Sequence, residues 1–193
     1  MTNLLWNLKA KFYLTIRKII PFNLILKSEN RNIEILLRSF NIKGKKVIDL
    51  GTGTGNILRY LKNSGFVLGI DRSLAMLLAT KQIYPEVILI QADTLKLAIK
   101  KNSFELITAV GLSEYLKDIN FLFKEVYRVL KNNGFFLMTF SPSGIWTRLR
   151  LLLGLRVYPR TLEEIVVIAE AMNFRLVRND QTLMQAQVLF QKL

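Results

Sequence analysis

Short apolar runs alternate with helical patterns along most of this sequence. The runs are nearly continuously apolar, which is typical of parallel strands covered on both faces. They span residues 46–50, 66–70, 86–91, 105–110 and 135–140. Two helical patterns precede them, one over residues 3–20 and one from about Ser28 to Asn41. Strands that alternate with helices predict a doubly wound, mostly parallel α/β sheet with N-terminal helices.

The last third of the chain predicts how this sheet ends. Thr161 with Glu164 forms a capping box that opens a helix, and Asn173 suits a left-handed position at its end. Two further strands follow, over about 174–177 and 186–190. The connection between them is too short for a crossover helix, so we expect them to pair antiparallel.

The most informative segment follows the first predicted strand. After residues 46–50 the chain has Gly51, Gly53 and Gly55 at alternate positions, and then a helical apolar pattern. Glycines are needed where a backbone turns sharply and approaches a ligand closely. Asp71 ends the second strand twenty residues after Gly51, where a carboxylate can accept from two ribose hydroxyls. Together these signals indicate a nucleoside-containing cofactor.

The spacing of the glycines distinguishes among such cofactors. A dinucleotide fingerprint, G-x-G-x-x-G, would need glycine at position 56, where the chain has Asn56. No G-x-x-x-x-G-K-[ST] is present, which excludes a P-loop. Asp49 stands beside the loop, and its charge would repel a pyrophosphate but suits the ammonium and sulfonium of S-adenosylmethionine.

On these motifs the chain resembles the class I S-adenosylmethionine-dependent methyltransferases, from about residue 40 to the C-terminus. The resemblance implies a Rossmann-like sheet of seven strands with an antiparallel last strand. It also implies that Asp49 faces the cofactor's amino group, Asp71 the ribose and Asp93 the adenine amine, while residues after the fourth strand border the methyl donor. The cofactor-binding residues expected in this way are Asp49, Gly51, Thr52, Gly53, Gly55, Asp71, Arg72, Ala92, Asp93, Thr94, Val110, Gly111 and Leu112.

Candidates for catalysis are few. The fourth strand is followed by Leu112-Ser113-Glu114-Tyr115-Leu116, not by the [DN]-P-P-[YF] of enzymes that methylate exocyclic or amide nitrogens. Glu114 and Tyr115 are the nearest candidates for a base or a substrate contact, although the same segment also suits packing with one solvated acid. The sequence has no cysteine and no histidine, which excludes a thiolate nucleophile, a histidine base and a Cys/His zinc site; we expect no metal.

Charge is concentrated outside the cofactor motifs. The net charge is +14; residues 1–48 carry ten basic and two acidic side chains (+8), and residues 141–160 carry four arginines and no acid (+4). A basic rim predicts an anionic partner, namely a phospholipid surface, a nucleic acid or an acidic metabolite. In residues 141–160 the arginines alternate with leucines, which fits a lid over an amphipathic substrate, an interfacial helix or an ordinary packed helix. We expect the substrate wall to include Trp6, Tyr13, Trp146 and Tyr158.

These observations favour a single methyltransferase domain. Its predicted parts are a helical cap (1–41), a cofactor-binding core (42–140), a basic and apolar lid (141–160), and a last helix with its hairpin (161–193). The resemblance favours a small, partly apolar or anionic substrate of quinone, tetrapyrrole or lipid type. An RNA methyltransferase and a non-catalytic cofactor-binding subunit are the alternatives. No run reaches the roughly 18 apolar residues of a spanning helix, so we expect a cytoplasmic protein, with peripheral contact with an anionic membrane as one option.

Overall fold

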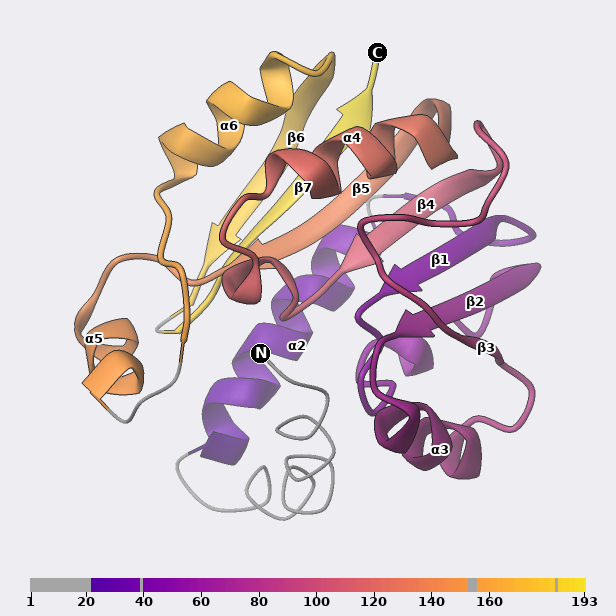
Figure 1. Cartoon of the computed structure of the whole chain (residues 1–193), viewed down its shortest axis with the longest axis horizontal. Helices are drawn as coiled ribbons and strands as arrows, with labels where there is room; N and C mark the ends of the chain where they lie inside the picture. Colours follow the sequence, from indigo (N-terminus) through magenta and orange to yellow (C-terminus); the bar gives the residue numbers. More distant parts are fainter. Residues whose placement is uncertain (1–21, 39, 153–155, 183) are drawn as a thin grey trace.

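A computed structural model describes residues 22–38, 40–152, 156–182 and 184–193. A seven-stranded sheet in the order β3-β2-β1-β4-β5-β7-β6 forms its centre (Figure 1). The strands are β1 (Lys46–Leu50), β2 (Phe66–Asp71), β3 (Ile88–Gln91), β4 (Phe104–Ala109), β5 (Leu130–Phe140), β6 (Phe174–Gln181) and β7 (Ala186–Lys192). The helices are α2 (Phe22–Arg38), η1 (Leu58–Tyr60), α3 (Leu74–Ile83), η2 (Ser113–Tyr115), α4 (Asn120–Val129), α5 (Ile145–Leu152) and α6 (Leu162–Glu170).

The predicted sheet is confirmed. Strands β1 to β5 pair parallel, and β7 runs antiparallel between β5 and β6. The capping box at Thr161 and Glu164 is present, and Asn173 adopts φ 57° after α6. Helices α4 and α6 cover one face of the sheet, where Phe123, Ile165 and Phe174 are buried, and α2 covers the other face through Ile33 and Leu36 (Figure 1).

Several element boundaries differ from the prediction, and three of these differences are informative. Helix α2 begins at Phe22 and ends at Arg38, so Ser28 lies inside it, and Asn41 instead closes a turn by accepting a hydrogen bond from the Lys43 N–H (3.1 Å). The pattern after Gly55 forms only the short 3₁₀ helix η1, because the chain must return within a few residues to start β2. Strand β5 begins at Leu130 and not at 135, and Asn133 (φ 61°) lies in an irregularity of its first half.

Candidate cofactor and substrate site

The predicted cofactor residues lie at the carboxyl ends of four adjacent strands. In the sheet, Asp49 of β1 pairs with Thr108 of β4, and Asp71 of β2 pairs with Gln91 of β3. Since these strands are parallel, the segments that follow them meet at one edge of the sheet. That edge is where open α/β sheets bind their ligands.

The glycine loop after β1 has two kinds of glycine. Gly51, Gly53 and Gly55 all adopt positive φ, at 68°, 53° and 76°. A Cβ on Gly51 would lie 3.1 Å from the Leu112 side chain, so this glycine permits the close packing of two predicted cofactor segments. A Cβ on Gly55 would lie 3.0 Å from the side chains of Leu58, Thr80 and Tyr84, the last two at the end of α3. At Gly53 the nearest atom would be a backbone oxygen at 3.8 Å, and Gly111 has nothing within 4 Å, so both face open space suited to a ligand.

Asp71 holds the glycine loop against β2. Its Oδ2 accepts a hydrogen bond from the Gly53 N–H and its Oδ1 one from the Ser73 N–H, both at 2.8 Å. Burial raises the pKa of the Asp71 carboxyl, while these N–H donors act in the opposite direction. Each carboxylate oxygen can accept more than one hydrogen bond. The arrangement therefore fixes the loop and leaves acceptor capacity for two hydroxyls.

Among the acidic residues at this edge of the sheet, Asp49 has the most strongly shifted pKa. It is only 3% exposed, and its Oδ1 accepts a hydrogen bond from the Thr108 hydroxyl at 2.7 Å. Burial raises its pKa to about 6, against the lowering effect of the Thr108 hydroxyl. The Thr52 hydroxyl is itself buried and has no well-formed hydrogen bond within the part of the chain that the structure describes. A buried acid beside an unsatisfied hydroxyl is a site that a cationic ligand would complete.

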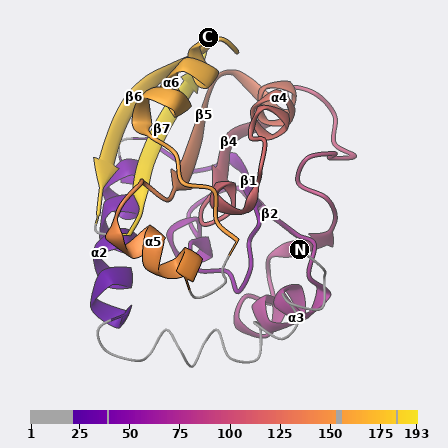
Figure 2. The same ribbon diagram turned by 60° about the vertical axis from the view of Figure 1, so that its left-hand side comes forward.

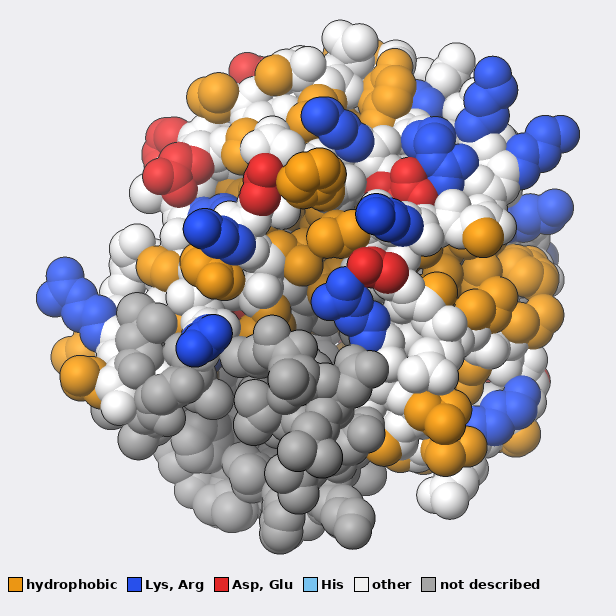
Figure 3. Space-filling model, in the orientation of Figure 1, with side chains coloured by type: hydrophobic (Ala, Val, Ile, Leu, Met, Phe, Trp, Pro, Cys, Tyr) orange, Lys and Arg blue, Asp and Glu red, His pale blue; other side chains and the backbone are white. Residues whose placement is uncertain are grey.

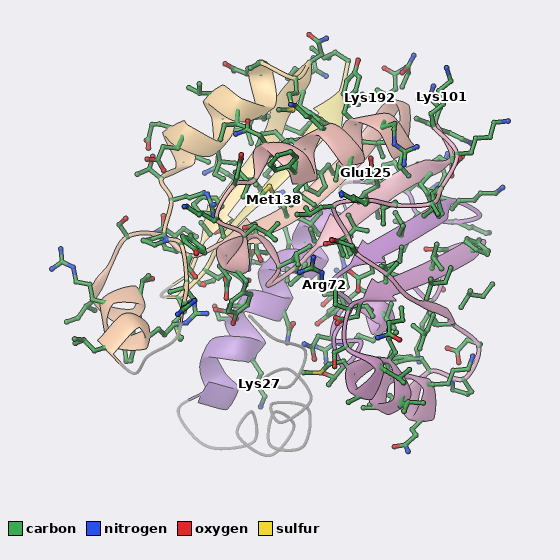
Figure 4. The ribbon with its side chains drawn as sticks, in the orientation of Figure 1. Lys27, Arg72, Lys101, Glu125, Met138 and Lys192 are labelled. Atoms are coloured by element: carbon green, nitrogen blue, oxygen red, sulfur yellow. The ribbon has the colours of Figure 1, made fainter. Side chains whose placement is uncertain are left out.

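The loop after β3 forms a polar cluster with the end of β2. Arg72 pairs with Asp93 at 2.6 Å, and the other oxygen of Asp93 accepts from the Leu95 N–H at 3.0 Å. Burial alone would raise the pKa of Asp93, but the Leu95 N–H and the Arg72 guanidinium hold it below its ordinary value. Ala92 donates its N–H to the Asp71 carbonyl, and Thr94 is buried. Figure 4 shows Arg72 near the glycine loop, at the end of β2.

The segment after β4, residues 110–112, packs against the glycine loop through Leu112 and Gly51. Gly111 (φ 71°) donates its N–H to the Thr139 hydroxyl of β5 at 2.8 Å. Val110 and Leu112 flank it and are partly buried, on opposite faces of the sheet. The structure thus places the predicted residues of all four strand ends along one edge of the sheet.

Glu114 and Tyr115 lie in a buried network that ties α5 to the end of β4. Arg150 pairs with Glu114 Oε1 at 2.6 Å, and the Ser141 hydroxyl donates to Glu114 Oε2 at 3.0 Å. Arg150 also donates to the Ser141 hydroxyl (2.8 Å) and to the Tyr115 hydroxyl (3.3 Å). Both oxygens of Glu114 are therefore engaged by protein groups.

Arg160 forms a second internal anchor for residues 141–160. It is 8% exposed, and its guanidinium donates to the Ser113 carbonyl at 3.0 Å and to the Leu116 carbonyl. The expected basic rim is thus only partly correct, because Arg150 and Arg160 face inward and Arg148 and Arg156 are exposed. Arginine is suited to such positions since its planar group satisfies several acceptors at once.

The expected substrate wall is only partly described. Trp146 and Tyr158 are partly buried, and Tyr158 donates its N–H to the Glu114 carbonyl at 2.7 Å. Trp6 and Tyr13 lie outside the described residues.

Several polar contributors were missed in the sequence, including Thr108, Thr139 and Ser141. All three are fully buried near the ends of β4 and β5. Each is a hydroxyl residue near the end of an otherwise apolar strand, and this pattern in the sequence could have identified them as site residues.

Comparison with known proteins agrees with this geometry. Residues 48–138 match the family model described as "Methyltransferase domain". The chain is 30% identical over 128 residues to a demethylmenaquinone methyltransferase of Thermotoga maritima, covering 65% of this chain and 55% of that protein. It is 27% identical over 107 residues to the protein of that name from Streptomyces griseus, covering 55% and 46%. The chain thus spans about half the length of these relatives.

Solved structures share the fold over most of the chain. Magnesium protoporphyrin IX methyltransferase from Synechocystis, with bound SAH (S-adenosylhomocysteine), superposes with a TM-score of 0.75 at 16% identity, covering 88% of this chain and 84% of that chain. A methyltransferase described as putative from Listeria monocytogenes gives a TM-score of 0.74 at 19% identity, covering 86% and 99%. The motifs, the strand order and the matched domain together identify residues 48–138 as a class I S-adenosylmethionine-dependent methyltransferase domain.

Proposed function

We propose that the chain binds S-adenosylmethionine at the carboxyl ends of β1 to β4 and methylates a small, partly apolar metabolite of quinone type. The observation that carries this proposal is the buried Asp49 beside the open backbone of Gly53 and Gly111. The bound cofactor would supply a methyl group made electrophilic by its sulfonium.

The chain's own residues suggest how the cofactor is held. The Asp49 carboxylate would face the amino group, and that charge would return its pKa toward the ordinary range. Asp71 would accept from the ribose hydroxyls while its existing bonds keep the glycine loop in place. Asp93 would accept from the adenine amine beside its ion pair with Arg72. Such fixed positions matter because methyl transfer requires the donor and the nucleophile to be collinear.

The quinone assignment is supported by the names of the relatives and by the apolar character of residues 141–160. Demethylmenaquinone methyltransferases share 27–30% identity with the aligned part of this chain. A tetrapyrrole is the alternative substrate, since one protein of similar fold is named magnesium protoporphyrin IX methyltransferase. The proposed location is cytoplasmic, in peripheral contact with a membrane that would hold the substrate. Within the described residues, no helix is long and apolar enough to cross a bilayer.

Glu114 suits positioning better than proton transfer. A general base must reach the substrate proton, and the Glu114 carboxylate is buried, with Glu114 only 6% exposed, and is held between Arg150 and Ser141. We therefore propose that Glu114 holds α5 beside the methyl-donor segment.

The direct test is transfer of an isotope-labelled methyl group from S-adenosylmethionine. A reduced demethylated naphthoquinone in detergent is the acceptor, and magnesium protoporphyrin IX and total RNA are parallel acceptors. Labelled naphthoquinol, formed by the native chain and lost in Asp71→Ala, is the expected result. Label in RNA alone would contradict the proposal, as would tight binding of S-adenosylmethionine with no transfer to either small acceptor.

A further inference from the structure

The outer face of α5 has an unusual surface for a folded domain. Ile145 is 78% exposed and Leu152 is 84% exposed, the highest values among the large hydrophobic residues described as exposed. Arg148 lies between them and is also exposed. Steps of three and four residues place these three side chains on one face of a helix. Two aliphatic side chains flanking an arginine therefore project together from α5.

The opposite side of α5 is fixed to the domain. The Thr147 hydroxyl donates to the Pro142 carbonyl at 2.7 Å, and Thr147 is only 3% exposed. Arg150 is held by Glu114 and Ser141 in the buried network. Thr147 and Arg150 thus fix the inner side of the helix, so Ile145 and Leu152, on the opposite side, face outward.

The exposed charge of the segment that contains α5 is of one sign. Residues 141–160 contain no acid, and because Arg150 and Arg160 are internal, Arg148 and Arg156 remain as the exposed basic side chains. At the position of α5 in Figure 1, the space-filling view in Figure 3 shows basic and hydrophobic side chains projecting together. Aliphatic groups with cationic neighbours match the interface of an anionic bilayer, where acyl chains lie below negative headgroups.

Helix α5 lies near the edge of the sheet that holds the proposed cofactor residues. Figures 1 and 2 place α5 beyond the carboxyl end of β5, on the side of the sheet edge that bears the glycine loop. Arg150 links α5 to Glu114, three residues after Gly111. A surface that contacts α5 would therefore lie close to the segment after β4, which is proposed to border the methyl donor.

We propose that the outer face of α5, formed by Ile145, Arg148 and Leu152 and helped by the exposed Arg156 later in the sequence, docks on an anionic lipid bilayer. This inference rests on the proposed function, because a site held against a bilayer serves a substrate dissolved in that bilayer. The two aliphatic side chains insert below the headgroups, the arginines lie among the lipid phosphates, and the Glu114–Arg150 pair keeps the docked helix aligned with the methyl donor.

Co-sedimentation of the full chain with vesicles tests this proposal. The vesicles contain equal parts of phosphatidylglycerol and phosphatidylcholine, or phosphatidylcholine alone. The Ile145→Ser/Leu152→Ser variant should partition into the anionic vesicles about a hundredfold more weakly, since each of the two aliphatic side chains contributes about tenfold when buried. The matched control, Leu78→Ser/Ile83→Ser, removes one leucine and one isoleucine that are 58% and 50% exposed on α3, and should bind as the native chain does. Arg148→Gln/Arg156→Gln should lower binding to the anionic vesicles only.

Equal loss of binding in both serine variants would overturn the proposal, as would equal binding to both kinds of vesicle or binding abolished by ribonuclease. Calorimetry with S-adenosylhomocysteine on each variant confirms that the fold and the cofactor site are intact. Methylation of a detergent-dissolved naphthoquinol with no vesicle binding would refute the docking surface alone. Vesicle binding with no methyl transfer to any acceptor would instead refute the proposed function.

Discussion

Replacing Asp49 with asparagine should stabilise the free protein and weaken cofactor binding at the same time. Asp49 is 3% exposed and its pKa is raised from 3.8 to about 6, mainly by burial. The folded protein therefore keeps the Asp49 proton up to about pH 6, while the unfolded chain releases it near pH 3.8. Stability falls as the pH rises through that window. At about 1.36 kcal/mol per pKa unit, the loss is about 3 kcal/mol above pH 6.

The Asp49→Asn substitution would remove this penalty. The new amide oxygen would still accept from the Thr108 hydroxyl, and the amide nitrogen could donate to the unsatisfied Thr52 hydroxyl. Allowing for a weaker bond to Thr108, we expect the variant to gain about 1–3 kcal/mol at pH 7.5, which is several degrees in melting temperature for a domain of this size. The gain should shrink toward zero near pH 4, where Asp49 of the native chain is largely protonated when folded and close to its ordinary pKa when unfolded.

Urea unfolding at about pH 4, 5 and 7.5 measures this difference. Glu170→Gln is the control, because it removes one negative charge from an exposed position. A stability difference between Asp49→Asn and the native chain that does not change with pH would refute the reasoning, and so would a destabilised variant at pH 7.5. Binding of S-adenosylhomocysteine should weaken about tenfold to a hundredfold in the variant. In the native chain the affinity should fall as the pH drops below about 6.

Three further changes probe other parts of the account. Asp71→Ala leaves the ribose hydroxyls and the Gly53 N–H without their acceptor, so calorimetry should show about tenfold to a hundredfold weaker binding of S-adenosylhomocysteine, and unchanged affinity would contradict the site. Gly53→Ala should cost about 1–2 kcal/mol at φ 53° and weaken cofactor binding, whereas Gly144→Ala, also at an open position, should do neither. Lys192→Met removes hydrogen bonds to the Tyr127 and Leu130 carbonyls (2.7 and 2.8 Å) far from the site (Figure 4). It should cost about 1–3 kcal/mol in urea unfolding and leave cofactor affinity unchanged; a large loss of affinity would be inconsistent with the account.

The parts of the fold predicted from sequence are those encoded locally. Apolar runs marked every strand, and the capping box and Asn173 marked the ends of α6, because each depends on residues a few positions apart. The beginning of α2 and the irregularity at Asn133 were not predicted. Each depends on packing or backbone geometry that competes with local preference.

In the candidate site, too, the sequence predicted the locally encoded features and missed the contacts between distant residues. The positions of Asp49 and Asp71 followed from strand ends, since parallel strands bring their carboxyl ends together. The Arg150–Glu114 pair joins residues 36 positions apart, and nothing in the sequence distinguished Arg150 from the exposed Arg148. Charge counting therefore overestimated the basic surface of residues 141–160, because it cannot tell a buried guanidinium from a solvated one.

A crystal structure of the chain with S-adenosylhomocysteine tests the central claim most directly. The account predicts the amino group against Asp49, the ribose hydroxyls on Asp71 and the adenine amine at Asp93, with the ligand passing the open faces of Gly53 and Gly111. A ligand bound elsewhere, or one bound at this edge with its ribose away from Asp71, would contradict it.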